Sequence, residues 1–392
     1  MTQQAHFYPV AEPDLSSLER EYLMDAFDSG WISSLGEYIT RFETSFAAFC
    51  STQHGVTVSN GTVALQLALL AADVGPGDVV IVPPLTFVAT ASAVRHVGAI
   101  PVFVDCEPDI GTLDPRKLEA AVSPRTRAII PVHLYGHPAD MDPIMECARK
   151  HDLIVIEDAA EAHGARYKGR PVGGLGHMAT FSFYGNKIIT TGEGGIIVTN
   201  DGRYASRIRF LKDHAMDPER RYWHPAVGFN FRMTNLQAAV GCAQLERFAA
   251  LTAKRQAIQD LYRARLSASG IQVNPFRDWA SPVPWLVCAL LPAGTDERTR
   301  DAIGNALKAR GIDFRPYFHL IPDMPPYAAA NASLRRHEPY PCARSVASRG
   351  LNLPSTTNLA ESAISYICNE LIATVNHLCR NESTGTRSTY WH

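Results

Sequence analysis

VVIVPPLTFVATASAVRHVGAIPVFVD, residues 79–105, holds the pattern that decides the fold. It opens on the strand-like run VVIVP (79–83), continues through TASAVRHVG (90–98) with helical spacing, and ends on a second apolar run, IPVFVD (100–105). Both apolar runs are rich in Val and Ile and bounded by Gly, Pro or Asp, which is typical of buried strands. A strand, a helix and a strand in this order predict two parallel strands joined by a crossover helix.

The same alternation is found on both sides of this stretch, from residue 62 to residue 200. Strand-like runs occur at RAIIPVH (127–133), LIVIED (153–158), ATFSF (179–183) and GGIIVTN (194–200), and helical spacing is found in TVALQLALLAA (62–72) and PIMECARKH (143–151). We therefore expect an α/β fold with a mostly parallel sheet covered by helices on both faces. In such sheets, ligands gather at the carboxyl ends of the strands.

The length of 392 residues favours more than one domain. We expect an N-terminal arm and large domain over residues 1–250, a smaller α+β domain over 251–380 and a polar tail over 381–392. The smaller domain would contain the strand WLVCALL (285–291) and the helix ERTRDAIGNALKARG (297–311).

Composition and charge exclude several classes of function. Lys and Arg total 37 against 39 Asp and Glu, a net charge of −2, which gives no general attraction to nucleic acid or an anionic membrane. No apolar run is long enough to span a bilayer, and the N-terminus does not resemble a signal peptide. The eight cysteines form no CxxC pair. We expect reduced thiols in a cytoplasmic protein, with no disulfide and no metal site.

VSNGTVALQLAL (58–69) is a candidate phosphate site. A short strand ends at Ser59, and a helix starts at Thr62 after a tight turn, so backbone N–H groups and a helix N-terminus converge on one spot. Gly61 would let an anion approach the backbone, and Thr62 adds a hydroxyl group. An ordinary capped helix start is the alternative. No GKS/T sequence follows, so a nucleotide P-loop is disfavoured.

LIVIEDAAEAHGA (153–165) delivers Asp158 to the carboxyl end of a strand. A carboxylate at such a buried place needs a partner, and a protonated ring nitrogen would supply one. A helix cap is an equally good interpretation. His163 has no second His or Cys at helical ligand spacing, so we expect it to be structural rather than a metal ligand.

Phe87 and Lys187 complete the set of candidate site residues. Phe87 follows the strand VVIVP and could stack on a planar ring, with burial in the core as the alternative. Lys187, in SFYGNKIITTGEGG (182–195), has apolar neighbours. If it is not simply solvated, its lowered pKa would suit Schiff-base formation. A phosphate cradle, an aromatic ring, a carboxylate and a lysine are together what pyridoxal phosphate requires.

The chain resembles the DegT/DnrJ/EryC1/StrS family of sugar aminotransferases, which have the fold-type I architecture of aspartate aminotransferase, with a seven-stranded sheet. The resemblance covers roughly residues 8–375. It is carried by GWISSLGEYITRFE (30–43), SNGTVALQLAL, PPLTFVATASAV, VHLYGHPADMDPI (132–144), IEDAAEAHGA, FSFYGNKIITTGEGG, GFNFRMTNLQAAVGCAQLE and RGLNLPS (349–355).

The resemblance implies a role for each candidate residue. Lys187 would bond to the aldehyde of pyridoxal phosphate, Asp158 would pair with the pyridinium nitrogen and Phe87 would stack on the ring. Other positions implied in cofactor binding are Gly61, Thr62 and Ser182 at the phosphate, Glu161 where many relatives have Gln near the ring hydroxyl, and Asn230 reaching the phosphate of a neighbouring subunit. The family therefore implies a homodimer with shared active sites.

The resemblance also implies a reaction. L-Glutamate would convert the cofactor to pyridoxamine phosphate, which would then aminate a nucleotide-linked keto-6-deoxy sugar. The closest likeness is to members that aminate GDP-4-keto-6-deoxymannose. A relative that removes a hydroxyl group instead has histidine at the position of Lys187.

Three alternatives to that reaction stay open. They are a dTDP- or UDP-linked 3- or 4-keto sugar, another keto substrate, and a non-catalytic regulatory role for the same fold. Arg315 and His319 are candidates for substrate binding. In HLIPDMP (319–325), however, His319 stands where the GDP-sugar members have Tyr, and Pro322 stands where they have His.

Overall fold

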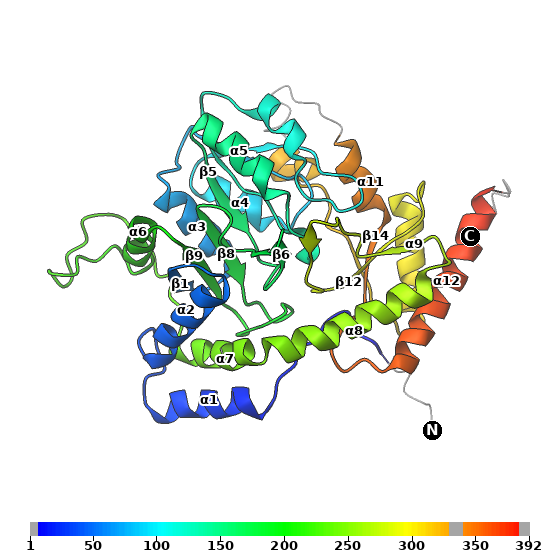
Figure 1. Ribbon diagram of the computed structural model, residues 1–392, viewed down its shortest axis with the longest axis horizontal. Helices are drawn as coiled ribbons and strands as arrows, with labels where there is room; N and C mark the ends of the chain where they lie inside the picture. The colour runs from blue at the N-terminus through cyan, green and yellow to red at the C-terminus, as the bar shows by residue number, and fades with distance from the viewer. Residues whose placement is uncertain (1–6, 329–339, 384–392) are drawn as a thin grey trace.

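The computed structural model describes residues 7–328 and 340–383 (Figure 1). Its centre is a seven-stranded sheet in the order β1-β9-β8-β5-β4-β2-β3. The strands are β1 (His54–Val58), β2 (Val79–Val82), β3 (Ile100–Phe103), β4 (Thr126–Ile129), β5 (Ile154–Asp158), β8 (Met178–Ser182) and β9 (Gly195–Thr199). Strand β9 runs antiparallel to both of its neighbours, and the other pairs are parallel. The expected mostly parallel sheet of seven strands is confirmed.

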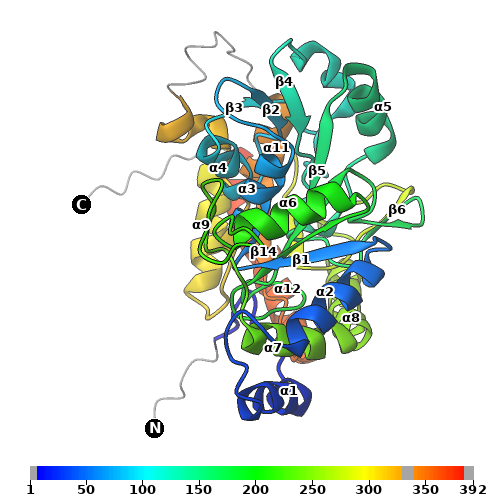
Figure 2. The ribbon, with the colours of Figure 1, turned by 90° about the vertical axis from the view of Figure 1, so that its left-hand side faces the viewer.

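Helices cover this sheet on both faces (Figures 1 and 2). On one face α3 (Gly61–Ala71) packs beside α4 (Ala89–His96) and α6 (Gly202–Lys212); on the other, α2 (Glu37–Phe49) packs on β1, backed by α7 (Asn235–Glu246). Successive side chains of β8 point to opposite faces of the sheet: Phe181 contacts Phe46 of α2, whereas Ser182 lies against Gly61 of α3. Helix α1 (Ser17–Asp28) packs on α7, and α5 (Met141–His151) precedes β5.

A second, antiparallel sheet builds the C-terminal part. Its order is β10 (Gln272–Val273), β12 (Val287–Leu290), β14 (Gly350–Leu353) and β13 (Arg315–Pro316). Helices α8 (Phe248–Leu266), α9 (Glu297–Lys308) and α12 (Glu361–Ser383) share a separate apolar core with this sheet, and α11 (Pro341–Arg349) leads into β14. The domain boundary expected near residue 250 falls inside α8. Of the polar tail expected over 381–392, the first three residues belong to α12 and the rest lie outside the described residues.

A third sheet of three short strands was not expected from the sequence. It pairs β6 (Arg166–Tyr167) with β7 (Arg170–Pro171) and with β11 (Ala280–Ser281). It joins a hairpin of the first half of the chain to a segment of the second half. The sequence did not predict it because strands of two residues are too short to show a periodic pattern. Four short 3₁₀ turns, η1 (Pro115–Lys117), η2 (Glu119–Ala121), η3 (Leu134–Gly136) and η4 (Ile321–Asp323), lie in the connections.

The topology gathers polar residues at one edge of the large sheet. The carboxyl ends of β1, β2, β5 and β8 meet there, and because β9 is antiparallel its amino end lies at the same edge. The loop from β8 to β9 therefore leaves and re-enters the sheet at this edge, and it carries Lys187. None of the described helices is apolar over enough of its length to cross a membrane.

A fully buried polar network fixes the loops around β5. The Glu157 carboxylate accepts hydrogen bonds from the backbone N–H groups of Gly173, Leu175 and Gly176, and from His133 Nε2 at 3.0 Å. His133 Nδ1 accepts the N–H of Ala139, so the ring proton is on Nε2. The network holds the segment before β8 and the segment after β4 against the strand that ends in Asp158.

The network predicts a large stability loss for Glu157→Ala. Removal of the carboxylate leaves three backbone N–H groups and one imidazole N–H buried without an acceptor, and we expect a loss of about 3–5 kcal/mol in the free energy of unfolding. Urea unfolding checks this against Glu146→Gln, an exposed carboxylate of α5 that should change stability by less than about 0.5 kcal/mol. Equal unfolding midpoints for the two variants would contradict the role given to the network.

Candidate active site

A cavity of about 760 Å³ opens at the edge of the large sheet where the strand ends meet. One wall comes from the turns after β1, β2, β5 and β8. The opposite wall comes from the C-terminal part through Trp285, Arg315, Phe318 and Asn352. Eight residues singled out from the sequence line this one cavity: Gly61, Thr62, Phe87, Asp158, Glu161, Ser182, Lys187 and Arg315.

The N-terminus of α3 forms one side of the cavity. Asn60 caps the helix by accepting the N–H of Val63 at 3.0 Å, so the ordinary capped start is present. The N–H groups of Gly61 and Thr62 make no hydrogen bond within the described residues, which leaves them for an anion. A Cβ on Gly61 would lie 2.8 Å from Ser182 Cβ, so a larger residue would close the cradle between α3 and β8. The capped helix start is therefore present, and the phosphate site remains a prediction that this geometry allows.

Asp158 ends β5 inside the cavity and is almost fully buried. Its carboxylate accepts the Thr90 hydroxyl at 2.7 Å and the N–H of Ala160 at 3.3 Å. Burial raises the pKa of Asp158 in spite of these two donors. A buried carboxylate of this kind gains most from a cationic partner, as a protonated ring nitrogen would be. The residues that follow β5 form turns and not a helix, so the helix cap that was the alternative for Asp158 is not present.

Lys187 extends into the cavity from the turn after β8. Its backbone N–H bonds to the Tyr184 carbonyl at 2.9 Å, and the Trp285 indole N–H donates to the Asn186 carbonyl at 2.7 Å, which ties the turn to the C-terminal part. The ammonium lies 3.9 Å from the centre of the Trp285 ring and 3.8 Å from Glu161 Oε1. Burial lowers the pKa of Lys187, and the carboxylates of Glu161 and Asp158 oppose this. Lys187 is thus not a solvated surface lysine.

Glu161 lies beside Lys187, three residues beyond the end of β5. Its Oε2 accepts the N–H of Tyr135 at 2.7 Å, and burial raises the pKa of the carboxyl to about 7. Near neutral pH the carboxyl group of Glu161 is therefore partly protonated, and the amine beside it has a lowered pKa. An arrangement of this kind can accept or release a proton at little cost.

Aromatic rings line the cavity between the two sheets. Phe87 is 56% exposed, so it is not buried in the apolar core. The centre of its ring lies 5.9 Å from the centre of the Phe318 ring. Phe318 in turn stacks on Tyr135, with ring centres 5.3 Å apart. A flat ligand could enter between Phe87 and the end of β5, as the sequence interpretation requires.

His163 is completely buried between the rings of Phe181 and Phe183. Neither of its ring nitrogens has a hydrogen-bond partner within the described part of the chain, and burial lowers its pKa to about 3. The side chain is therefore neutral and packs as an aromatic residue, which fits the structural role expected from the sequence.

Asn230 and His319 do not line this cavity. Asn230 is exposed on the long segment between α6 and α7, which projects from the body of the molecule (Figure 1). Its amide oxygen accepts Arg232 Nε at 3.1 Å. His319 is exposed beside the lining residue Phe318.

Among the residues that the sequence analysis did not single out are Trp285 and Tyr135, which line the cavity, and Thr90, which donates a hydrogen bond to Asp158. Trp285 was assigned only to an apolar strand, whose first residue in the structure is Val287. Thr90 belongs to the first turn of α4, and Tyr135 lies in η3 with a left-handed φ of 50°. The only local signal for Thr90 and Tyr135 is a polar or aromatic residue shortly after a predicted strand, and Trp285 gives no signal beyond its place at the start of one.

Comparison with known proteins agrees with this site. The model of the DegT/DnrJ/EryC1/StrS aminotransferase family matches residues 13–372. The chain is 49% identical to GDP-perosamine synthase of Caulobacter vibrioides over 361 residues, 91% of this chain and 95% of that protein. It is 41% identical to GDP-perosamine synthase of Escherichia coli O157:H7, over 93% of this chain and 98% of that protein.

Solved structures agree in fold. The putative sugar aminotransferase Spr1654 from Streptococcus pneumoniae has a TM-score of 0.90 in its PMP form and 0.89 in its PLP form. It is 26% identical to this chain in the first comparison, which covers 96% of this chain and all of that one. The fold-type I architecture expected from the resemblance is confirmed.

The pair of Glu161 and Lys187 predicts a pH dependence of stability in the protein without added ligand. The pKa of Glu161 is about 7 in the fold against 4.5 for the free side chain. Between these values the folded state holds a proton that the unfolded state has lost, so wild-type stability falls as pH rises, and Glu161→Gln lacks this fall. Unfolding midpoints measured from pH 4.5 to 7 should therefore shift steadily in favour of the variant.

The control for this measurement is Glu193→Gln. Glu193 also lines the cavity but is exposed, so its variant should follow the wild-type profile. Parallel profiles for wild type and Glu161→Gln over this pH range would show that Glu161 ionises as a free side chain does.

Proposed function

The chain belongs to the DegT/DnrJ/EryC1/StrS aminotransferase family, and on that premise we propose that it transfers the amino group of L-glutamate to GDP-4-keto-6-deoxymannose to give GDP-perosamine. Pyridoxal phosphate is the cofactor, as the PLP and PMP forms of a structural neighbour indicate. The likeness to two GDP-perosamine synthases at 49% and 41% identity supports the choice of substrate.

One observation carries the proposal: Lys187 is buried in a cavity together with a carboxylate that needs a cation and a helix N-terminus that can receive an anion. The residues fit the cofactor. The free N–H groups of Gly61 and Thr62, with Ser182, would hold its phosphate, and Asp158 would face its ring nitrogen. Phe87 would cover the ring. The cofactor, when bound, supplies an electron sink that lets a neighbouring C–H proton leave.

The protein's own side chains then perform the proton chemistry. Lys187, whose pKa burial lowers, can act first as nucleophile and then as general base and acid. Glu161 lies 3.8 Å away and can hold the proton that Lys187 gives up. Trp285 and the backbone of Asn186 keep the Lys187 turn in place, so the amine is already oriented before a substrate enters.

Arg315 is the one permanent cation among the residues that line the cavity. A guanidinium group suits a carboxylate or a diphosphate, so we assign it to the anionic substrate, either glutamate or the nucleotide sugar. His319 is adjacent to Phe318 and is proposed to contact the outer part of the sugar nucleotide. Pro322, at the position where the GDP-sugar members have His, is buried in η4 and offers no side-chain donor.

A panel of keto sugars tests this substrate. With L-glutamate as donor, we expect wild-type enzyme to aminate GDP-4-keto-6-deoxymannose in preference to dTDP- and UDP-linked 3- or 4-keto sugars. Lys187→Ala should lose at least about 10²–10⁴-fold in turnover because it removes the group that moves the proton. Lys168→Ala, an exposed lysine paired with Asp142, is the matched control and should keep full turnover.

The outcomes separate the alternatives. Amination of only dTDP or UDP sugars would move the chain to another substrate within the same family. No amination of any keto sugar by protein that carries cofactor would favour the regulatory role.

We further propose that the enzyme is a homodimer in which each active site takes Asn230 from the partner subunit. The segment that carries Asn230 projects from the body and exposes large apolar residues, Tyr222, Trp223 and Val227. Trp31, Ile32 and Leu35, between α1 and α2, are also exposed. Exposed apolar groups of this size support an interface between copies.

Complementation tests the shared site. Lys187→Ala and Asn230→Ala homodimers should each turn over poorly. After subunit exchange between equal amounts, half of the dimers are mixed, and each mixed dimer has one intact site, so activity should return to about a quarter of wild type. If each subunit used its own Asn230, no mixed dimer would have an intact site and no activity would return.

A further inference from the structure

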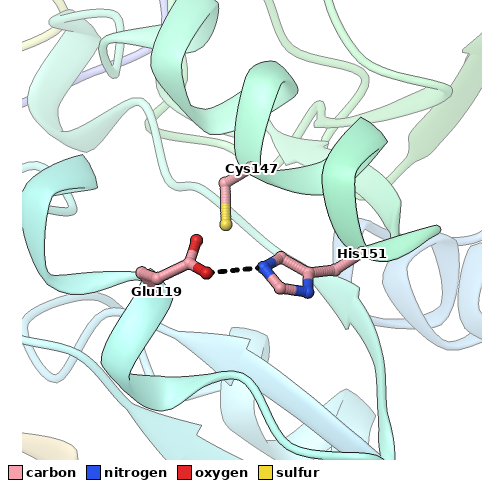
Figure 3. A group of neighbouring side chains, drawn as sticks. All are labelled: Glu119, Cys147 and His151. Carbon is pink, nitrogen blue, oxygen red and sulfur yellow. Dashed lines mark hydrogen bonds and ion pairs between the residues drawn. The ribbon is translucent and has the colours of Figure 1, made fainter.

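A cluster of side chains that can act as metal ligands lies near the amino ends of β4 and β5, whereas the cavity lies at the carboxyl ends of the strands. Cys147 and His151 are one turn apart on α5, and Glu119 comes from η2 (Figure 3). Figure 3 shows the thiol and the carboxylate on the same side of the imidazole ring. One donor atom from each residue lies within 4.8 Å of the other two, and Glu119 Oε1 is 2.9 Å from His151 Nε2.

We propose that Glu119, Cys147 and His151 bind one zinc ion, with a water molecule as the fourth ligand. A thiolate, an imidazole and a carboxylate are the three ligand types that zinc takes from proteins, and four-coordinate zinc is tetrahedral. With metal–ligand bonds of about 2.0–2.3 Å, tetrahedral donors lie roughly 3.2–3.6 Å apart. The donor atoms lie within 4.8 Å of one another, so the side chains need to shift by about an ångström, with the 2.9 Å pair of Glu119 and His151 opening slightly; the exposure of Glu119 permits this.

The charges of the cluster also suit a divalent cation. A thiolate and a carboxylate carry two negative charges, which the ion neutralises while His151 stays uncharged. In the present arrangement Glu119 is paired with His151 and with Lys150 Nζ at 2.6 Å. The Lys150 side chain is 62% exposed, so the ion displaces only a surface ion pair, and such pairs stabilise proteins little.

The location indicates what the ion would do. Glu119 lies a few residues before β4, and α5 ends shortly before β5, so the ion joins the segments that lead into two adjacent parallel strands. Asp158 is at the far end of β5. The zinc ion therefore stabilises the fold at the amino ends of β4 and β5 and takes no part in amino transfer.

The sequence analysis expected no metal site, because it searched for paired cysteines and for a second ligand near His163. The spacing of Cys147 and His151 is itself a helical ligand pair. Its third member is 28 residues away from Cys147 in the chain, and only the fold brings it close.

Cobalt titration of the cofactor-loaded, metal-free protein tests the proposal. Cobalt chloride should give the visible absorption bands of tetrahedral cobalt with one thiolate ligand, at longer wavelengths than the absorption band of the cofactor. Addition of zinc chloride should abolish these cobalt bands. Cys147→Ser should remove this absorption, whereas Cys342→Ser, which removes another partly exposed thiol, should keep it. In both proteins amino transfer should match wild type.

Lys150→Gln provides a test that does not depend on removing a ligand. It deletes the ammonium that competes for Glu119, so zinc should bind up to about fivefold more tightly. Excess zinc should also raise the unfolding temperature of wild type and Cys342→Ser but not of Cys147→Ser. Absence of the cobalt absorption in wild type, its persistence in Cys147→Ser, or weaker zinc binding by Lys150→Gln would each overturn the proposal.

Discussion

Burial of the Lys187 ammonium beside Glu161 and Asp158 is the constraint on which the active site depends. A lone buried ammonium is costly, and the lysine pKa falls to relieve that cost. Two buried carboxylates, whose own pKa values burial raises, hold the amine in place without fully restoring its charge. The Trp285 ring closes the third side at 3.9 Å. Lys187 is thereby kept close to the state in which it can attack a carbonyl group or move a proton.

The fold supplies these groups from distant parts of the chain. Asp158 and Glu161 come from the end of β5, Lys187 comes from the turn between β8 and β9, and Trp285 comes from the C-terminal part. The buried pair of Glu157 and His133 fixes β5 and its neighbouring loops, so the carboxylates are held by a polar network of their own. The antiparallel direction of β9 is what returns the Lys187 turn to the same sheet edge.

Local patterns were enough to predict the strands of the large sheet and to single out Asp158, Lys187 and Gly61, which line one cavity; their roles in cofactor binding remain predictions. Each of these lies at or next to the end of a strongly apolar run, and parallel topology puts such ends together. Trp285, Thr90 and Tyr135 could not be found in this way. Their roles follow from tertiary contacts between residues 26 or more positions apart, which leave no period in the sequence. The three-residue group at Glu119 was missed for the same reason.

Peptide mapping after borohydride reduction tests the central claim most directly. Reduction of the cofactor-loaded enzyme should lock the cofactor covalently onto one lysine, and mass spectrometry of the digest should place it on the peptide that contains Lys187. Glu161→Gln should still carry the cofactor on Lys187, because Glu161 supplies a proton partner and not the attachment point. Attachment to any other lysine, or no attachment in protein that retains bound cofactor, would contradict the account.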